Sequence, residues 1–248
     1  MTGNTVRWLV LMPIVSLLLA ACGGEDDEVN MSAAATATAG AALTAQQILA
    51  LASDRLDATE TVHFGLDIDG RTFIDEDDTI QILSAEGNLK RPDRVQASFA
   101  ANLLARANVT IRIITVGAVT WWTDLVSGEW TLAPPEIGYD ASILFDHEIG
   151  LAPVLRTFSD ARRVPDEEID GIPAFSVAGS MPRERIDAIT AGTLSGDQVD
   201  VQVWIERATG NILRVVVRES EDVPEAERAT WTLNISRHDE PVTIEPPI

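Results

Sequence analysis

Apolar and polar residues alternate with a period of two along most of the chain after residue 60, which is typical of strands with one buried face. In the run over residues 61–69, Val62, Phe64 and Leu66 fall on one face, and polar residues or glycine fall on the other. Similar runs follow at 94–103, 109–113, 199–205, 212–217 and 230–235. The series predicts an antiparallel meander of roughly nine or ten strands with one apolar face.

A helix is predicted just before the first strand. Thr44 followed by Gln47 fits a capping box, and Ile48 and Leu51 begin an apolar pattern with helical spacing. We expect this amphipathic helix to end near Ala58.

Two later stretches interrupt the strand pattern. Residues 139–155 are apolar but irregular and predict short helical turns. If the fold encloses a cavity, this segment is either a lid over the cavity mouth or a static connector. Asp170-Gly171 predicts a tight hairpin. Ser180 is placed to cap a further short helix that ends at Gly192.

These elements predict an α+β fold in which few and short helices cover a wide sheet. Helices of this size leave two alternatives, a tightly packed core or a hollow between sheet and helices. Ala97, Ala100 and Ala101 reduce side-chain volume in one strand. They favour the hollow only weakly, because small residues also occur where helices pack closely.

The N-terminus reads as an export signal. Residues 1–21 contain one positive charge, Arg7, then an apolar run over 8–19 and two alanines. The run is too short for a convincing membrane-spanning helix. Small residues followed by Cys22 resemble the bacterial lipobox, in which the thiol receives a diacylglycerol before cleavage. We expect a mature protein that begins at lipidated Cys22; an ordinary signal peptide and an uncleaved anchor are the alternatives.

Composition changes after the cysteine and predicts two further regions. Residues 22–43 are biased to Ala, Thr, Gly and acidic residues, and predict a lipidated N-terminus with a flexible tether. Residues 44–248 have the length of a single domain with a sizeable core.

The charge balance narrows the classes of partner. The chain has 18 basic and 39 acidic residues and a formal net charge of −21. Nucleic-acid binding depends on Lys and Arg that neutralise phosphates, so this excess of acid argues against it. It also argues against electrostatic attraction to anionic lipids, so the anchor must act through its acyl chains.

No pattern for catalysis, a metal or a cofactor is present in the sequence. His63, His147 and His238 lie without metal-ligand spacing, and no G-x-S-x-G motif occurs. Acidic residues at 67–70 and 75–78 could attract calcium, but neither segment matches an EF-hand loop. We therefore predict a non-enzyme without a cofactor.

An ordered series of short motifs resembles the LppX/LprG family of mycobacterial lipoproteins. Besides the lipobox, the series comprises Thr61-Val62-His63-Phe64, Gly87-Asn88-Leu89, Trp121-Trp122, Trp130, Tyr139-Asp140-Ala141-Ser142-Ile143-Leu144, Gly150-Leu151-Ala152-Pro153-Val154-Leu155, Ile169-Asp170-Gly171 and Val203-Trp204-Ile205. The resemblance implies a curved antiparallel half-barrel, similar to the LolA and LolB carriers. Helices would cross its concave face and enclose an apolar cavity for the acyl chains of a lipid or glycolipid.

On this basis we expect a lipoprotein held by acylated Cys22 at the extracytoplasmic face of the cell membrane, which carries lipid toward the cell surface. A membrane transporter is a further candidate partner. The alternative is a surface interaction module with a solid core, such as an adhesin, a receptor or a transporter accessory. The candidate ligand-binding residues, each also compatible with an ordinary core, are Phe64, Leu66, Val95, Ala97, Phe99, Val109, Ile111, Val201, Val203, Trp231 and Leu233.

Overall fold

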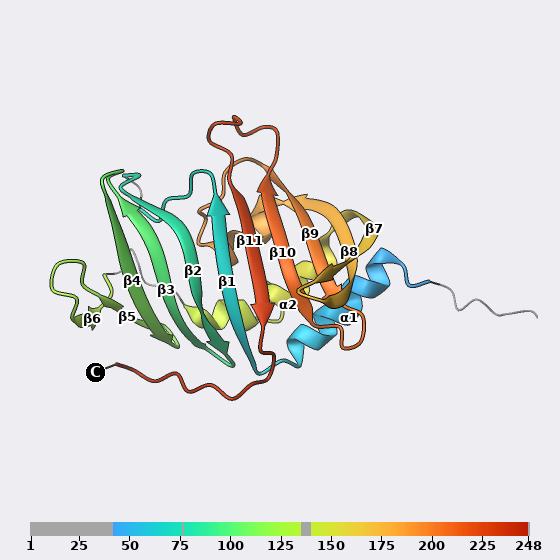
Figure 1. The fold of residues 1–248 in the computed structure, drawn as a ribbon, viewed down its shortest axis with the longest axis horizontal. Coiled ribbons are helices and arrows are strands. Elements are labelled where there is room, and N and C mark those ends of the chain that lie inside the picture. The colour runs from blue at the N-terminus through green and yellow to red at the C-terminus, as the bar shows by residue number, and fades with distance from the viewer. Residues whose placement is uncertain (1–41, 76, 135–139, 248) are drawn as a thin grey trace, which may run out of the picture. The chain divides into compact units, whose positions relative to one another are not determined.

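The computed structural model describes residues 42–75, 77–134 and 140–247, and this part of the chain is built on one antiparallel sheet of 11 strands (Figure 1). The strand order is β6-β5-β4-β3-β2-β1-β11-β10-β9-β8-β7. Residues 41–248 form one compact unit. The predicted signal peptide, Cys22 and nearly all of the predicted tether lie outside the described residues.

Two meanders make up the sheet. The first comprises β1 (Thr61–Asp69), β2 (Ile80–Lys90), β3 (Arg94–Leu103), β4 (Ala107–Val116), β5 (Val119–Thr123) and β6 (Trp130–Leu132). The second comprises β7 (Ser159–Ile169), β8 (Ile172–Pro182), β9 (Gln198–Glu206), β10 (Ile212–Glu219) and β11 (Thr230–Ser236). β11 pairs with β1, with Phe64 opposite Ile235, and this pairing joins the two meanders into a single sheet.

The predicted first helix is confirmed as α1 (Ala45–Asp57). Thr44 is its N-cap: the Gln47 backbone N–H donates to Thr44 Oγ1 at 3.2 Å, and the Thr44 N–H donates to Gln47 Oε1 at 2.8 Å. Ile48 of α1 is fully buried, in one core cluster with Val177 of β8 and Val203 of β9. α1 therefore fills the space over the half of the sheet that contains β8 and β9.

The irregular middle of the chain forms short helical turns, as predicted. These are the 3₁₀ turn η2 (Ala141–Phe145), α2 (Leu151–Val154) and the 3₁₀ turn η3 (Leu155–Thr157). Figure 1 shows α1 and α2 together behind the sheet. No described helix is long and apolar enough to cross a membrane.

The prediction of a helix capped by Ser180 is wrong in its start. β8 continues through Pro182, and Ser180 pairs with Ser159 and Asp200 of the neighbouring strands, so its backbone belongs to the sheet. The 3₁₀ turn η4 (Arg183–Arg185) and α3 (Asp187–Thr190) follow. The predicted end is close to the observed one, because Ala191 caps α3 in the left-handed conformation and Gly192 also has a positive φ.

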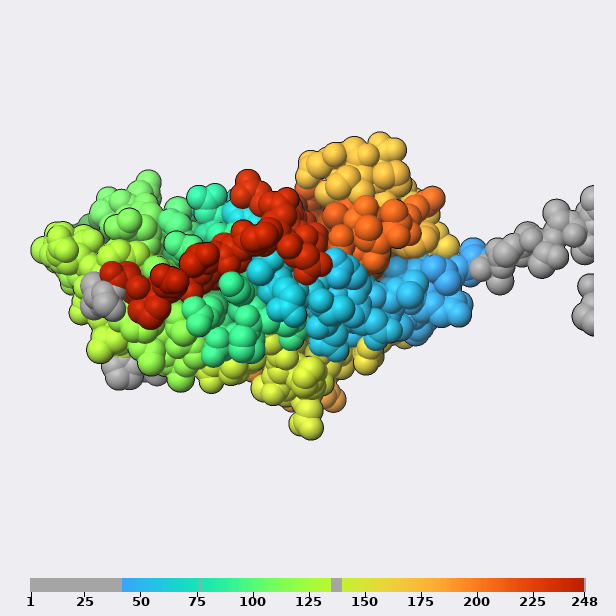
Figure 2. All heavy atoms as spheres, turned by 90° about the horizontal axis from the view of Figure 1, so that it is seen from below, coloured from blue at the N-terminus to red at the C-terminus, as the bar shows by residue number. Residues whose placement is uncertain are grey.

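The C-terminal segment, residues 237–247, runs along the end of the first meander (Figures 1 and 2). Lys90 Nζ donates to Val242 O at 2.9 Å and Arg94 Nη1 donates to Ile244 O at 2.5 Å. Ile244 is buried. This segment is therefore an integral part of the domain, held by side chains at the β2–β3 turn.

Candidate functional site

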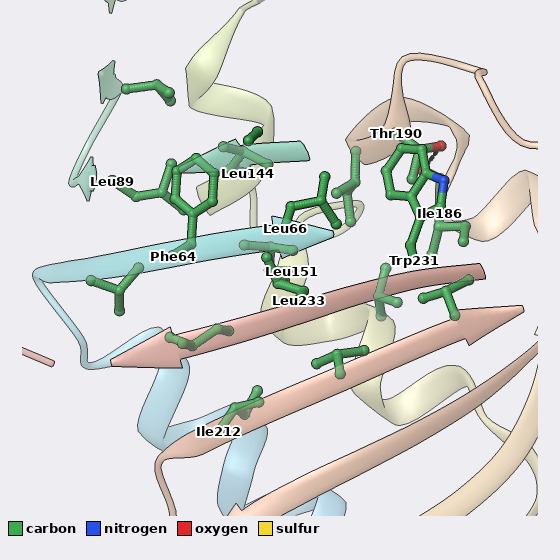
Figure 3. Close-up of a pocket in the computed structure, with 18 of the residues that line it drawn as sticks. Phe64, Leu66, Leu89, Leu144, Leu151, Ile186, Thr190, Ile212, Trp231 and Leu233 are labelled. Carbon is green, nitrogen blue, oxygen red and sulfur yellow. Dashed lines mark hydrogen bonds between the residues drawn. The ribbon is translucent and has the colours of Figure 1, made fainter. Parts of the chain in front are cut away.

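A cavity of about 460 Å³ lies between the sheet and the short helices (Figure 3). Small-molecule sites in proteins typically measure about 300–1,000 Å³. Its wall is mainly aliphatic and aromatic. Of the two alternatives that the residue pattern leaves open, the structure has the hollow.

β1 forms the long axis of the cavity. Val62, Phe64, Leu66 and Ile68 all line it, because alternate residues of a strand point to the same side. From the first to the last of these residues the strand rises by about 20 Å. The cavity is therefore long and follows the strand direction.

Small residues beside Phe64 leave room for the cavity. Phe64 lies opposite Gly87 of β2, and Gly87 lies opposite Ala97 of β3. A Cβ on Gly87 would stand 2.1 Å from Gln96 O and 2.8 Å from Ala97 Cα. The two strands approach so closely at this point that only glycine fits.

Short helical segments form the opposite wall. Leu144 and Phe145 come from η2, Leu151 and Val154 come from α2, and Ile186 precedes α3. Of α1, only the residues near its C-terminal end approach the cavity, with Leu56 in the wall. The cavity thus lies where short turns, rather than the long helix, face the sheet.

Most of the residues predicted to bind a ligand lie in this wall. They are Phe64, Leu66, Val95, Ala97, Phe99, Ile111, Val201, Val203, Trp231 and Leu233. Val109 instead packs against Ile82, Ala101 and Ile111, in a separate core cluster. That these residues bind a ligand stays a prediction.

Several wall residues were not among the predicted ones. Many of those on strands share the alternation of the predicted residues and could have been found by it, among them Val62, Ile68, Ala85, Leu89, Ile113, Val215, Val217 and Ile235. The helical wall has no such signal, because η2 and α2 are too short to show a period. Residues 140–155, the described part of the predicted lid, supply part of this wall, and movement of the segment stays a prediction.

Polar residues gather where α1 meets β1. Thr59, Glu60, Thr61 and Arg91 line the cavity there. Arg91 Nε donates to Thr59 O at 2.9 Å and its guanidinium carbon lies 4.7 Å from the centre of the Phe145 ring. This end of the cavity therefore differs in chemistry from its apolar length.

At the far end of β1 the cavity wall has hydroxyl groups. Trp231 Nε1 donates to Thr72 Oγ1 at 3.1 Å, and Thr190 and Thr193 of the α3 region also line this part (Figure 3). The indole N–H is satisfied within the wall, which allows the apolar ring of Trp231 to face the interior.

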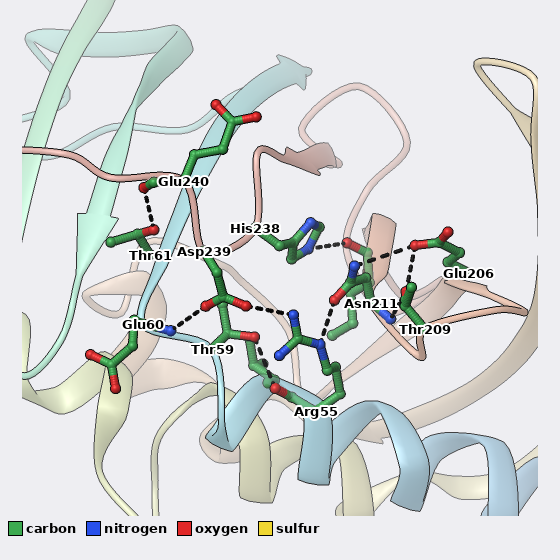
Figure 4. Close-up of polar contacts among 12 residues, drawn as sticks. Arg55, Thr59, Glu60, Thr61, Glu206, Thr209, Asn211, His238, Asp239 and Glu240 are labelled. Carbon is green, nitrogen blue, oxygen red and sulfur yellow. Dashed lines mark hydrogen bonds and ion pairs between the residues drawn. The ribbon is translucent and has the colours of Figure 1, made fainter.

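A hydrogen-bond network fixes the corner between α1, β1 and the C-terminal segment (Figure 4). Arg55 Nη2 and Asp239 Oδ2 lie 2.6 Å apart, and Arg55 Nε donates to Asn211 Oδ1 at 2.8 Å. The Glu60 N–H donates to Asp239 Oδ1 at 2.8 Å. The hydrogen bond from Arg55 lowers the pKa of Asp239. The network holds the polar end of the cavity in place.

The histidines lie in separate environments. His63 Nδ1 is 3.1 Å from Asn88 Oδ1, His238 Nε2 is 3.1 Å from Ile212 O, and the His147 side chain is exposed. Within the described ranges, no group of three or more His, Cys, Asp or Glu residues is arranged to hold a metal ion. Asp75, in one of the two acidic segments, accepts hydrogen bonds from the Thr79 and Ile80 N–H groups and so closes its own loop.

Comparison with known proteins assigns the fold. Residues 44–244 match the model of the LppX_LprAFG lipoprotein family. The crystal structure of LprF from Mycobacterium bovis superposes with a TM-score of 0.65 at 21% sequence identity, covering 82% of this chain and 96% of LprF. LppX from Mycobacterium tuberculosis superposes with a TM-score of 0.58 at 16% identity, covering 81% of this chain and 98% of LppX.

A LolA superfamily protein from Nitrosomonas europaea is a more distant structural neighbour, with a TM-score of 0.27 at 13% identity over 81% of this chain and 96% of that protein. No curated protein sequence matches the chain. Membership of a lipoprotein family implies an envelope-associated protein held by a membrane anchor. The family match covers nearly all of the described sheet and its helices, and the chain belongs to the LppX_LprAFG lipoprotein family.

Proposed function

We propose that this protein is a membrane-anchored lipid carrier, which holds the acyl chains of a lipid or glycolipid in the cavity and carries them toward the cell surface. The observation that supports the proposal best is the cavity itself, about 460 Å³ of space with a mainly apolar wall along the whole of β1. An ordinary core would fill this space, because protein interiors are packed as densely as organic crystals.

Burial provides the binding energy in this proposal. Apolar surface that leaves water gains about 25 cal/mol per Å². The cavity reaches the molecular surface, since Glu60 and Ala191 both line it and are both exposed. A carrier of this kind needs no reactive group and no cofactor.

The anchor belongs to the same proposal. Acylated Cys22 would hold the protein at the extracytoplasmic face, and residues 22–43 would link the anchor to the domain. Acyl chains suit this purpose because the net charge of −21 gives no electrostatic attraction to anionic membranes. A membrane transporter is a candidate source of the cargo.

The alternative function, a surface interaction module with a solid core, has less support because the interior is hollow. The test is to express residues 41–248, which form one compact unit, in the cytoplasm and in the envelope of a bacterial host. Organic extraction of the purified domain and mass spectrometry should identify bound lipid. Absence of lipid from both preparations, together with no binding of added fatty acids or phospholipids, contradicts the carrier function.

A further inference from the structure

Two residues of opposite charge line the same end of the apolar cavity. Among the described residues of the cavity wall, Glu60 and Arg91 are the charged ones. The Arg91 N–H donates to Glu60 O at 2.9 Å, which continues the pairing of Thr61 with Lys90 by one residue beyond the ladder. The two side chains therefore start from directly opposite positions of neighbouring strands.

Arg91 is held rigidly at this end. Its Nε donates to Thr59 O and its Nη2 donates to Leu56 O at 3.1 Å, so two edges of the guanidinium are bound to the end of α1. The Phe145 ring covers one face. Nη1 has no hydrogen-bond partner within the described part of the chain and remains for a ligand that accepts from it.

Glu60 has the opposite arrangement. Its backbone N–H is bound to Asp239, whereas its carboxylate is exposed and points away from the Asp239 network (Figure 4). No ion pair joins Glu60 to Arg91 among the described residues, although their strand positions are adjacent. The two charges thus stay separate, each available to a different group of one ligand.

The local charge balance selects the class of ligand. Asp57 Oδ1 lies 3.6 Å from Arg91 Nη2 and has no hydrogen bond, and His147 lies 3.9 Å from the same oxygen. A purely anionic headgroup at Arg91 would compete with the Asp57 carboxylate, which already forms an ion pair with Arg91, and would gain nothing from the exposed Glu60 carboxylate. A headgroup with a cationic group next to its anionic group would be attracted both by Arg91 and by the nearby carboxylates.

We propose that this end of the cavity binds the headgroup of a zwitterionic, amine-bearing phospholipid. The phosphate accepts a hydrogen bond from Arg91 Nη1, and the ammonium group pairs with the Glu60 carboxylate at the rim. The acyl chain then lies along β1, from Val62 toward Ile68 and Trp231. This inference rests on the proposed lipid binding and adds the headgroup and its orientation.

The experiment uses single-chain lipids below their micellar concentration with delipidated residues 41–248. Lysophosphatidylethanolamine, lysophosphatidylglycerol, monoacylglycerol and a monoacyl glycolipid, all with the same acyl chain, are compared by calorimetry. We expect lysophosphatidylethanolamine to bind most tightly. Glu60→Gln should weaken it by roughly two- to fivefold, the effect of an exposed ion pair, and should not weaken lysophosphatidylglycerol.

Arg91→Gln should weaken both phospholipids on the order of tenfold, the effect of a charge-assisted hydrogen bond, and should leave monoacylglycerol nearly unchanged. Glu129→Gln, an exposed carboxylate in the β5–β6 turn, is the matched control and should change nothing. If Arg91→Gln does not fold because the α1 region carbonyls lose their donors, Glu60→Gln alone decides, since among the described residues only the backbone of Glu60 is hydrogen-bonded.

Two results would overturn the headgroup proposal while leaving lipid binding intact. One is equal affinity of the wild-type domain for all four lipids, or tighter binding of the glycolipid. The other is an unchanged preference between the two phospholipids in Glu60→Gln. A wild-type domain that binds none of the four lipids would instead contradict the proposed function itself.

Discussion

At the scale of single residues, the room inside the domain depends on Gly87 and Ala97. Both belong to the concave face, between larger side chains such as Phe64. Alternation along the strand predicted that Ala97 faces the interior, and the structure places it in the cavity wall. The other two alanines of the strand behave differently: Ala101 is buried outside the wall and Ala100 is exposed. Alternation separates Ala100, which lies on the other face of β3, from Ala97 and Ala101. It does not separate Ala97 from Ala101, because only Ala97 lies in the part of the face that borders the cavity.

Gly87→Ala should destabilise the domain. Its new Cβ would stand 2.1 Å from Gln96 O, and backbone atoms cannot turn aside as a flexible side chain does. We expect a loss of about 1–3 kcal/mol, as for other overpacked interiors, measured by urea unfolding. Gly65→Ala in the adjacent strand is the control, since its Cβ would meet nothing within 4 Å. Equal unfolding midpoints for the two variants would show that β2 and β3 are not so close.

Ala97→Trp should remove most of the bound lipid. The indole would extend from the wall into the space beside Phe64 and occupy it. Ala100→Trp adds the same side chain three residues later on the exposed side of β3 and should leave lipid loading unchanged. Both variants are compared by mass spectrometry of extracted lipid, with the melting temperature as a check on folding. Full loading of Ala97→Trp would place the ligand elsewhere.

At the scale of elements, the best-predicted parts are those with a local chemical signal. α1 begins at the predicted Thr44 cap and has its C-cap at Ala58, because the capping box and the helical spacing agree. Asp170-Gly171 forms the predicted hairpin, with Ile169 opposite Ile172. Ser180 misled the prediction, because a good capping residue can equally lie in a strand when its backbone pairs on both sides.

For a related reason, the sequence could not predict which polar residues lie at the end of the cavity. Arg91 follows a strand and Glu60 precedes one, and nothing in their spacing relates them. Only the pairing of β1 with β2 brings them to opposite positions. Element boundaries and partners, rather than residue types, determine this part of the site.

Protonation of His238, in the C-terminal segment, should make the domain less stable in mild acid. Burial lowers the pKa of His238, and nearby Arg55 adds to this effect, whereas the hydrogen bond to Ile212 O and the charges of Asp239 and Glu206 oppose it. With its pKa below the unfolded value of about 6.5, the native state binds the proton less readily than the unfolded state. The stabilising contribution is therefore complete above pH 6.5 and is lost as the pH falls below it.

Urea unfolding at pH 7 and at pH 5 measures this loss. The urea concentration at the wild-type unfolding midpoint should be lower at pH 5 than at pH 7. The same decrease should be smaller in His238→Gln. His147→Gln, whose side chain is 84% exposed, should behave as wild type. The carboxylates with a lowered pKa, such as Asp239 and Asp166, lose their stabilising contribution at lower pH, below their ordinary pKa of 3.8. An identical pH dependence in His238→Gln would remove His238 as the cause.

At the scale of the whole molecule, the alternating pattern predicted the class of fold but not its assembly. It does not tell which strands pair outside hairpins, and the β1–β11 contact that unites the two meanders joins segments far apart in the sequence. The position of α1 over β8 and β9 likewise follows from packing in three dimensions. Since the cavity lies mainly where short turns rather than α1 face the sheet, its existence was open from pattern alone, and the family resemblance supplied the expectation.

The domain and its predicted anchor together should determine where the protein is found. If Cys22 is acylated, Cys22→Ala should release the protein from membranes into the soluble envelope fraction, because neither the acidic surface nor any described helix provides another hold. One acyl chain binds only marginally and two or three bind firmly, so the change should be close to complete. Cell fractionation with immunoblotting measures it, and Ser32→Ala, in the predicted tether, is the control.

The Cys22→Ala variant should still load lipid in extraction experiments, since the cavity is more than 30 residues away in sequence. Continued membrane association of Cys22→Ala would instead indicate an uncleaved N-terminal helix as the anchor.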